Sequence, residues 1–200
     1  MDRIKLQEPK LGGDVSLEKA LAQRRSIRTY KNDALTLPQC ARLLWCANGI
    51  TEKHGLRAVP SAGALYPLEV YLVAGSVEGL KRAIYKYLPK EHDLVMHLDG
   101  DCRAELASAA LGQPWVEVAP ASIVIAAVYE RTKRRYGERG ERYVHMEAGH
   151  AAQNVQLQAT ALNLGSVIVG AFDDAAVKNV LALPPEEQPL LIIPVGQKRA

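Results

Sequence analysis

The sequence predicts an α+β fold in which a central mixed or antiparallel β-sheet is flanked by helices. Strand-like and helix-like patterns alternate irregularly along its 200 residues. Residues 122–129 form a continuous run rich in β-branched residues and alanine, typical of a central strand, and residues 143–164 carry the longest helical pattern. With 48% apolar residues and no repeat or linker, we expect one domain over residues 1–200.

Two helices are predicted within the first 50 residues. Residues 15–23 repeat apolar side chains at helical spacing. The second helix begins after Thr36, which can form a capping box with Gln39, and Gly49 ends it.

The remaining elements are indicated by apolar periodicity between turn residues. In order, they are a rigid loop at 60–67, a strand at 69–74, a hairpin of 85–88 and 94–98, a helix at 101–111, the strand at 122–129, the helix at 143–164, a short strand at 166–169, a helix at 174–181 and a strand at 190–195. Residues 131–142 are strongly charged, and we expect them to form a solvated connection. Gly165 is expected at the C′ position of the long helix.

Charge and cysteine content exclude several classes of protein. With 25 basic and 22 acidic residues, the net charge of +3 is too small to indicate a nucleic-acid or membrane partner. Residues 1–14 contain no apolar run suited to a signal peptide, so we expect a cytoplasmic protein. Three widely spaced cysteines, Cys40, Cys46 and Cys102, are typical of buried core thiols rather than of disulfides or a zinc site.

A basic segment, residues 24–28, follows the first predicted helix with the sequence Arg-Arg-Ser-Ile-Arg. Guanidinium groups bind phosphate oxygens through paired hydrogen bonds, so three of them can converge on one phosphate. From these five residues alone, a solvated basic turn is the simpler interpretation.

Four motifs in the same order resemble the nitroreductase family, and within it the SagB-type dehydrogenase branch. They are the basic segment, the sequence Pro-Ser-Ala-Gly-Ala-Leu-Tyr-Pro at residues 60–67, the helical motif at 142–154 and the segment at 164–172. The resemblance covers roughly residues 18–199 and is far more specific than any single motif.

The resemblance implies an intertwined homodimer with one FMN bound between both subunits at each site. The positions that match FMN contacts of the family are Arg24, Arg25, Ser26, Arg28, Pro60, Ser61, Ala62, Ala64, Ile168, Val169, Gly170, Ala171, Lys198 and Arg199. It assigns Arg24, Ser26, Arg28 and the C-terminal basic residues to the phosphate and ribityl chain, and places Arg25 near the flavin. It assigns residues 60–64 to a loop that the partner lays beside the ring.

The resemblance also implies a reaction in which NADH or NADPH transfers hydride to flavin N5 and an electron-poor small molecule, such as a nitroaromatic compound or a quinone, is then reduced by a ping-pong mechanism. Backbone N–H groups of Gly170 and Ala171 match positions near N5. Many family members carry an acidic residue where this chain has Gly170, so we expect a more open and less negative site here. No general acid is identified.

Two other interpretations involve charged residues. On a helix, His145 and His150 are separated by about 140° of rotation and cannot share a ligand face, so we expect no zinc site. His92 and His97 flank the predicted hairpin and are expected at the surface, and His54 is expected in a polar loop. Residues 131–142 could form a nucleic-acid-binding arm, but the acidic residues among them favour a solvated segment, and we expect neither a nucleic-acid nor a membrane partner.

Two alternatives to a nitroreductase-like enzyme stay open. Azoline dehydrogenases of the same branch oxidise rings in modified peptides and carry a Lys-Tyr pair where this chain has Arg135 and Tyr136. Arginine stays protonated, which argues against that chemistry, although Tyr136 can still line a substrate pocket. The second alternative is a protein that binds or stores FMN without turnover.

Overall fold

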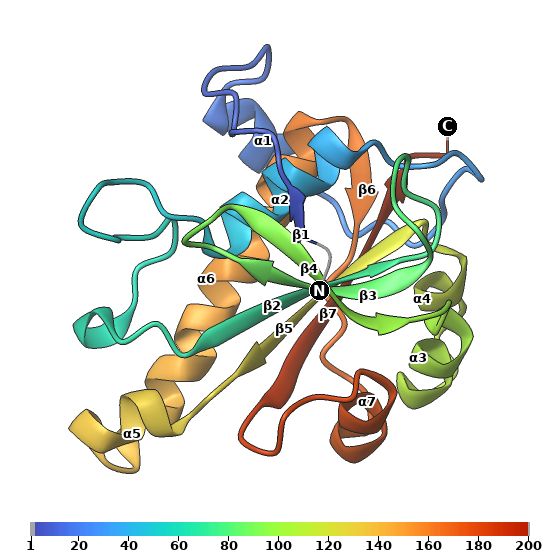
Figure 1. The fold of residues 1–200 in the computed structure, drawn as a ribbon. Coiled ribbons are helices and arrows are strands. Elements are labelled where there is room, and N and C mark those ends of the chain that lie inside the picture. Colours follow the sequence, from blue (N-terminus) through green and yellow to red (C-terminus); the bar gives the residue numbers. More distant parts are fainter. Residues whose placement is uncertain (1–2, 200) are drawn as a thin grey trace.

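The computed structural model describes residues 3–199 and contains a seven-stranded sheet in which the ladders between named strands are all antiparallel. Met1, Asp2 and Ala200, at the ends of the predicted domain, lie outside the described residues. Across the sheet, the strands are β1 (Arg3–Lys5), β4 (Asp93–Asp99), β3 (Ala83–Leu88), β2 (Leu68–Ala74), β5 (Ala121–Ala127), β7 (Gln188–Gln197) and β6 (Leu164–Ser166) (Figure 1).

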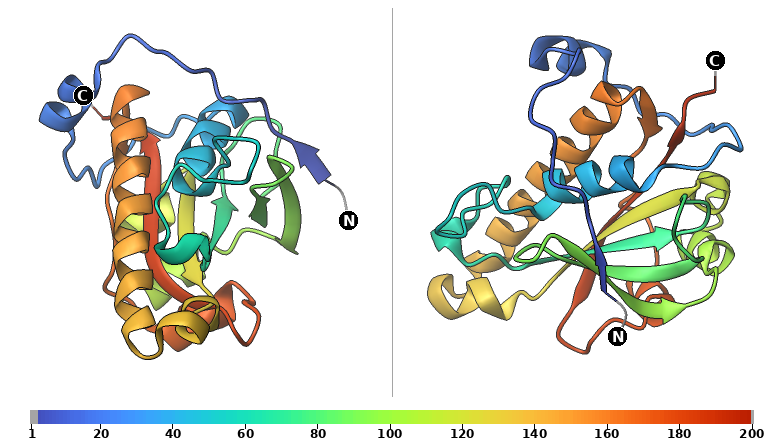
Figure 2. Two further views of the ribbon diagram at one scale, coloured as in Figure 1. Left: turned by 90° about the vertical axis from the view of Figure 1, so that its left-hand side faces the viewer. Right: turned by 45° about the horizontal axis from the view of Figure 1, so that its top comes forward.

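Helices cover both faces of this sheet (Figure 2). One face packs against α2 (Leu37–Asn48) and α6 (Arg139–Ala161), and α1 (Leu17–Gln23) lies against α6. The opposite face packs against α3 (Arg103–Ala109), α4 (Pro114–Val118) and α7 (Asp174–Val180). The short helix α5 (Glu130–Tyr136) connects β5 to α6, and a single 3-10 turn, η1, spans Ala62–Ala64.

The two helical layers bury two separate hydrophobic cores, and β5 contributes to both. Ile123 and Ile125 face the core shared with α2 and α6, whereas Val124 and Ala126 face the core shared with α3, α4 and α7. Every residue of β5 is buried. Burial on both faces explains why the strand is a continuous apolar run rather than an alternating pattern.

Local signals in the sequence correctly identify most elements. Thr36 and Gln39 form the capping box at the start of α2, with Gly49 as C-cap. The expected α+β class with helices on a central sheet is confirmed, as are the strand at 69–74, the hairpin and the central strand.

The expectations for residues 131–165 are partly wrong. The charged stretch is helical, because α5 begins at Glu130 and α6 begins at Arg139. Gly165 does not end α6; Asn163, with φ of 57°, takes the left-handed conformation there. Gly165 instead lies within β6, where an added Cβ would meet Ile27 Cγ2 at 2.7 Å. The strand expected at 166–169 is β6 plus a bridge between Val169 and Ile192.

Three short elements, β1, α4 and α5, have no clear apolar pattern and are absent from the sequence prediction. Cys40 is buried and its pKa is raised to about 12 by burial, as expected of a core thiol, while Cys46 and Cys102 are only half-buried. His92 is buried rather than at the surface; its Nε2–H donates to the Gln7 carbonyl, and its Nδ1 shares a hydrogen bond with the Tyr87 hydroxyl.

Candidate functional site

The basic segment runs from the end of α1 along the edge strand β6. Its backbone is fixed there, because Ile27 N donates to the Ser166 carbonyl at 2.9 Å and Ser26 bridges the same residue. Gly165 lets Ile27 pack against β6, since any Cβ at this position would collide with it. Sheet pairing therefore holds residues 26–27 in place between the flanking arginines.

The three arginines of the basic segment differ in their surroundings. Arg24 is half-buried, with its Nη1 3.5 Å from Gln156 Oε1 on α6. Arg28 is exposed and stacks over the ring of Trp115 on α4, with Cζ 5.3 Å from the ring centroid. Arg25 is exposed and donates to backbone carbonyls of its own turn. Arg24 and Arg28 thus each lie beside a polar side chain from another element.

Those two neighbours present buried donors. Gln156 Nε2 and Trp115 Nε1 are both inaccessible to solvent and have no hydrogen-bond partner among residues 3–199. Buried N–H groups in proteins are normally paired. Two unpaired donors next to Arg24 and Arg28 form a donor set suited to a ligand with several oxygen atoms, such as a phosphate ester.

The C-terminal basic residues return to the same part of the molecule. Lys198 bridges Tyr30, and Lys31 N donates to the Gln197 carbonyl at 3.0 Å. Lys198 is half-buried and Arg199 is exposed. The end of β7 is therefore held beside Tyr30, two residues along the chain from Arg28.

The small-residue loop, residues 60–64, is a tight turn that packs against α5. Ser61 Oγ accepts a hydrogen bond from Tyr66 N at 2.9 Å, and Gly63 has φ of 64°. A Cβ on Gly63 would lie 2.9 Å from Tyr136 Oη and 3.1 Å from Nη1 of Arg135. The structure thus brings Tyr136 together with this loop. Pro60, Gly63 and Ala64 are exposed, while Ser61 and Ala62 are half-buried.

The third group, which we call the Gly170 segment, comprises residues 168–171. Val169 is buried and bridges Ile192, whereas Ile168, Gly170 and Ala171 are exposed. A Cβ on Gly170 would meet only Leu191 Cδ2, at 3.7 Å. Packing does not require glycine at this position, and its absent side chain leaves open space.

That space is a pocket of about 480 Å³ beside the Gly170 segment, which we call the Gly170 pocket. It lies between α6, the loop before α7 and the start of β7. Its lining residues are Tyr129, His145, Ala148, Gly149, Gly170, Phe172, Asp174, Gln188, Pro189, Leu190 and Leu191.

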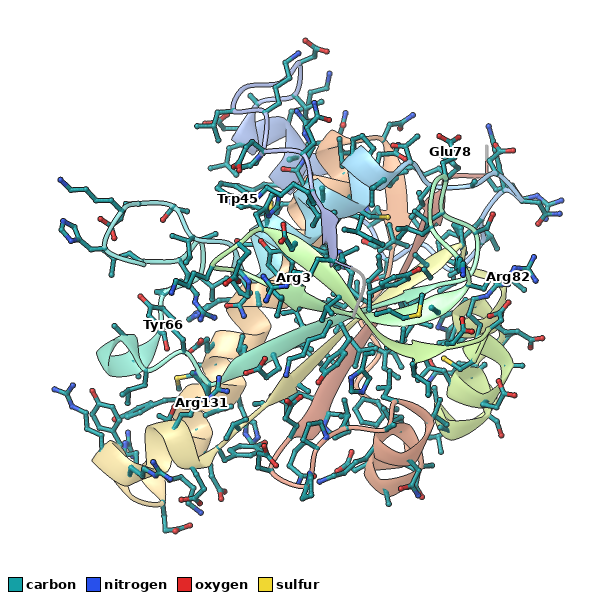
Figure 3. The ribbon with its side chains drawn as sticks, viewed as in Figure 1. Arg3, Trp45, Tyr66, Glu78, Arg82 and Arg131 are labelled. Carbon is teal, nitrogen blue, oxygen red and sulfur yellow. The ribbon has the colours of Figure 1, made fainter. Side chains whose placement is uncertain are left out.

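Within one chain, the basic segment and the small-residue loop are far apart. Arg24 lies beside Gln156, whereas the Ser61 hydroxyl lies near Glu147, nine positions earlier on α6. At 1.5 Å per residue, these contact points are about 13 Å apart along the helix. Figures 1 and 3 show the same separation, with α1 at one end and Tyr66, at the end of the loop, beside Arg131 at the other.

The nitroreductase family model matches residues 21–197 of this chain. The chain belongs to the nitroreductase family.

A nitroreductase homologue from Methanocaldococcus jannaschii is 48% identical over 197 residues, covering 98% of both chains. The crystal structure of a nitroreductase homologue from Ralstonia eutropha has a TM-score of 0.87 and 26% identity, covering 99% of this chain and 90% of the other. An NADPH:FMN oxidoreductase from Vibrio harveyi shares the fold, with a TM-score of 0.67 and 21% identity over 92% of this chain and 69% of its own.

Similarity to a peptide-processing protein supports the SagB-type branch of the nitroreductase family. The trifolitoxin-processing protein of Rhizobium leguminosarum is 29% identical over 140 residues, which cover 68% of this chain and 38% of that protein. The match to that relative is therefore partial, in contrast to the full-length match with the archaeal homologue.

Tyr129 and His145 are paired at the wall of the Gly170 pocket, a contact that the sequence does not predict. Tyr129 Oη and His145 Nε2 are 2.6 Å apart, and the rings meet edge to face. These residues are 16 positions apart, and only His145 belongs to one of the four motifs. Gln156 and Trp115 are missed for the same reason, because only tertiary contacts bring them to the basic segment.

The structure also places the charged residues that were considered for metal or nucleic-acid binding. Glu147 is buried, while His145 and His150 are exposed, and no cluster of three metal-ligating side chains occurs within residues 3–199. Arg131 pairs with Glu69, and Lys133 pairs with Glu138 and Glu141.

Within residues 3–199, no helix has the length and apolarity to cross a bilayer.

Proposed function

We propose that the protein is an FMN-dependent oxidoreductase that passes hydride equivalents from NADH or NADPH to an electron-poor small molecule, such as a nitroaromatic compound or a quinone. The observation that carries this proposal is that α4 joins the basic segment to the Gly170 segment. Trp115 of α4 stacks with Arg28, and Gln113, the residue before α4, donates to the Ala171 carbonyl at 2.8 Å. Phosphate-binding groups and an open backbone surface thus share one edge of the molecule.

The donor set along this edge fits FMN. Arg24, Ser26 and Arg28 would hold the phosphate and ribityl chain, aided by Lys198 and Arg199, and the backbone of Gly170 and Ala171 would face the ring. Each charge-assisted hydrogen bond contributes about 1.5–3 kcal/mol, so several hold a cofactor without a covalent bond. Bound FMN would supply the hydride-accepting atom that protein side chains lack. The space above Gly170 would admit nicotinamide and the second substrate in succession.

We further propose that two copies of the chain form each FMN site. The small-residue loop lies about 13 Å along α6 from the contact point of Arg24, estimated from the helical rise. The small-residue loop of a second copy would complete the site that the basic segment and the Gly170 segment of the first copy form. Small side chains suit this role because the loop backbone has to approach a flat ring.

Anaerobic stopped-flow absorbance tests the proposed reaction. The purified protein should be yellow, release a cofactor with the mass of FMN, lose flavin absorbance on mixing with NADH or NADPH, and regain it with 1,4-benzoquinone. A bound flavin that neither nucleotide bleaches would favour the storage alternative. A colourless protein that does not take up added FMN would contradict the proposal itself.

The SagB-type relationship gives one observation in favour of a second candidate, an azoline dehydrogenase of modified peptides. Tyr136 lies against the small-residue loop, which is the loop proposed to approach the FMN ring. Its neighbour in the chain is Arg135, however, and arginine does not lose its proton as a lysine can. We therefore rank this activity below reduction of small molecules. Oxidation of a thiazoline peptide by the flavin-loaded protein would reverse that order.

A further inference from the structure

The Gly170 pocket contains one hydrogen-bonded pair of titratable side chains. Tyr129 follows β5 and is half-buried, and His145 lies on the second turn of α6 and is exposed. Their 2.6 Å hydrogen bond crosses from one element to the other at the pocket wall. Much of the remaining wall is apolar, with Phe172, Pro189 and Leu191 among its residues.

We propose that Tyr129 is the proton donor to the substrate in this pocket and that His145 positions and reprotonates it. The proposal rests on the proposed function, because it places the second substrate beside the Gly170 segment. The direction of the hydrogen bond decides whether the phenol is available. When His145 is cationic, its Nε2–H donates to the Tyr129 oxygen, and the phenol O–H is free to donate to a ligand.

Reduction of the second substrate consumes a proton as well as a hydride. Reduction of a quinone to a hydroquinone adds one hydride, which originates from NADH or NADPH, and one proton. The Tyr129 O–H bond breaks as the substrate O–H bond forms, and the phenolate oxygen takes the Nε2 proton of the His145 imidazolium. His145 then takes a proton from water, to which it is exposed.

The charged groups that face this pair are acidic. Asp174, at the start of α7, lines the same pocket, and Glu141 precedes His145 by one turn of α6. Burial, together with these two carboxylates, raises the pKa of Tyr129. The phenol therefore keeps its proton until a substrate oxygen gains negative charge.

Two electron acceptors separate proton donation from electron transfer. With flavin-loaded protein and NADH or NADPH as reductant, 1,4-benzoquinone requires a proton for its reduction, whereas ferricyanide takes one electron and no proton. Tyr129→Phe should lower kcat/KM for benzoquinone about 100-fold and leave ferricyanide reduction within about twofold of wild type. His145→Gln should lower kcat/KM for benzoquinone about 10-fold while ferricyanide reduction stays within about twofold of wild type, because the imidazole reprotonates Tyr129 and takes no part in electron transfer.

Ligand affinity provides a readout without turnover. Tyr129→Phe should weaken binding of 4-nitrobenzamide to the oxidised, flavin-loaded protein about fivefold, the loss of one neutral hydrogen bond. The matched control is His150→Gln, which changes an exposed histidine of the same helix outside the pocket and should behave as wild type.

Wild-type benzoquinone kinetics in Tyr129→Phe would overturn the proposal, as would equal losses with both acceptors, since these indicate damage to the fold or to cofactor binding. A wild-type protein that reduces neither acceptor would contradict the proposed function, and this inference with it.

Discussion

At the scale of single residues, burial determines which side chains have altered chemistry. Glu147 is the clearest case, because its side chain lies on α6 with only 3% of the residue exposed. Burial raises the pKa of Glu147 to about 7, although the Ser61 hydroxyl and the Arg57 guanidinium act in the opposite direction. This carboxyl group therefore connects α6 to the small-residue loop and has a pKa close to neutral pH.

We expect Glu147→Gln to stabilise the protein at alkaline pH. Between its ordinary value of 4.5 and about 7, the native state binds more protons at Glu147 than the unfolded chain does. The free energy of unfolding therefore falls as pH rises through this range, and the contribution is fully present only below it. Glutamine has no charge to desolvate, so the variant should exceed wild type by about 1–3 kcal/mol at pH 8 and converge with it near pH 5.

Urea unfolding at several pH values measures this difference. Glu186→Gln, at an exposed carboxylate, is the control and should follow wild type at every pH. Parallel curves for Glu147→Gln and wild type would show that Glu147 has an ordinary pKa.

The sequence identifies candidate residues only where they belong to a contiguous motif. Arg24, Arg28 and Gly170 each lie in such a motif. Tyr129 lies in none of them, and although His145 lies in the helical motif at 142–154, its pairing with Tyr129 depends on how β5 leads into α5 and how α5 turns into α6. A single sequence carries no signal for contacts of this kind, and the same applies to the orphan donors of Gln156 and Trp115.

At the scale of elements, the sequence places the end of the long helix correctly but assigns it to the wrong residue, Gly165. The sequence pattern indicates a helix stop, yet Asn163 provides the left-handed residue and Gly165 serves the contact between β6 and the basic segment. The charged helix α5 is missed because it has only one buried residue, Thr132, and therefore no apolar stripe.

Gly165→Ala should disturb the basic segment. Its Cβ would lie 2.7 Å from Ile27 Cγ2 and 2.9 Å from Ile27 Cβ, so the branch point of the isoleucine has to move and not only a flexible end. We expect a loss of about 1–3 kcal/mol of stability together with weaker FMN binding, measured by denaturation and by flavin titration.

Gly13→Ala is the matched control, because a Cβ there meets no atom within 4 Å, its φ is not left-handed, and it lies outside the Gly170 pocket. If Gly165→Ala bound FMN with the affinity of wild type, Gly165 would have no influence on the FMN site.

At the scale of the whole molecule, the fold class follows from local patterns but the order of strands does not. β5 lies between β2 and β7, and the edge strand β6 pairs with the later strand β7. These neighbours are far apart in sequence, and their selection depends on burial of both faces of β5 against two helical layers. The same arrangement places the basic segment and the small-residue loop at different ends of α6.

The central claim is that the basic segment of one copy and the small-residue loop of another close around one FMN. Arg28→Ala should remove a phosphate contact, and Ala62→Trp should obstruct the approach of the loop to the ring, so each variant alone should purify largely without flavin. In a heterodimer of the two variants, one site combines both defects and the other combines neither.

The decisive measurement is therefore the flavin content of that heterodimer, isolated with two different affinity tags after co-expression. We predict about one FMN per heterodimer, since one intact site is restored by the mixed assembly. Heterodimers that remain without flavin, although each variant folds, would contradict a site shared between two copies.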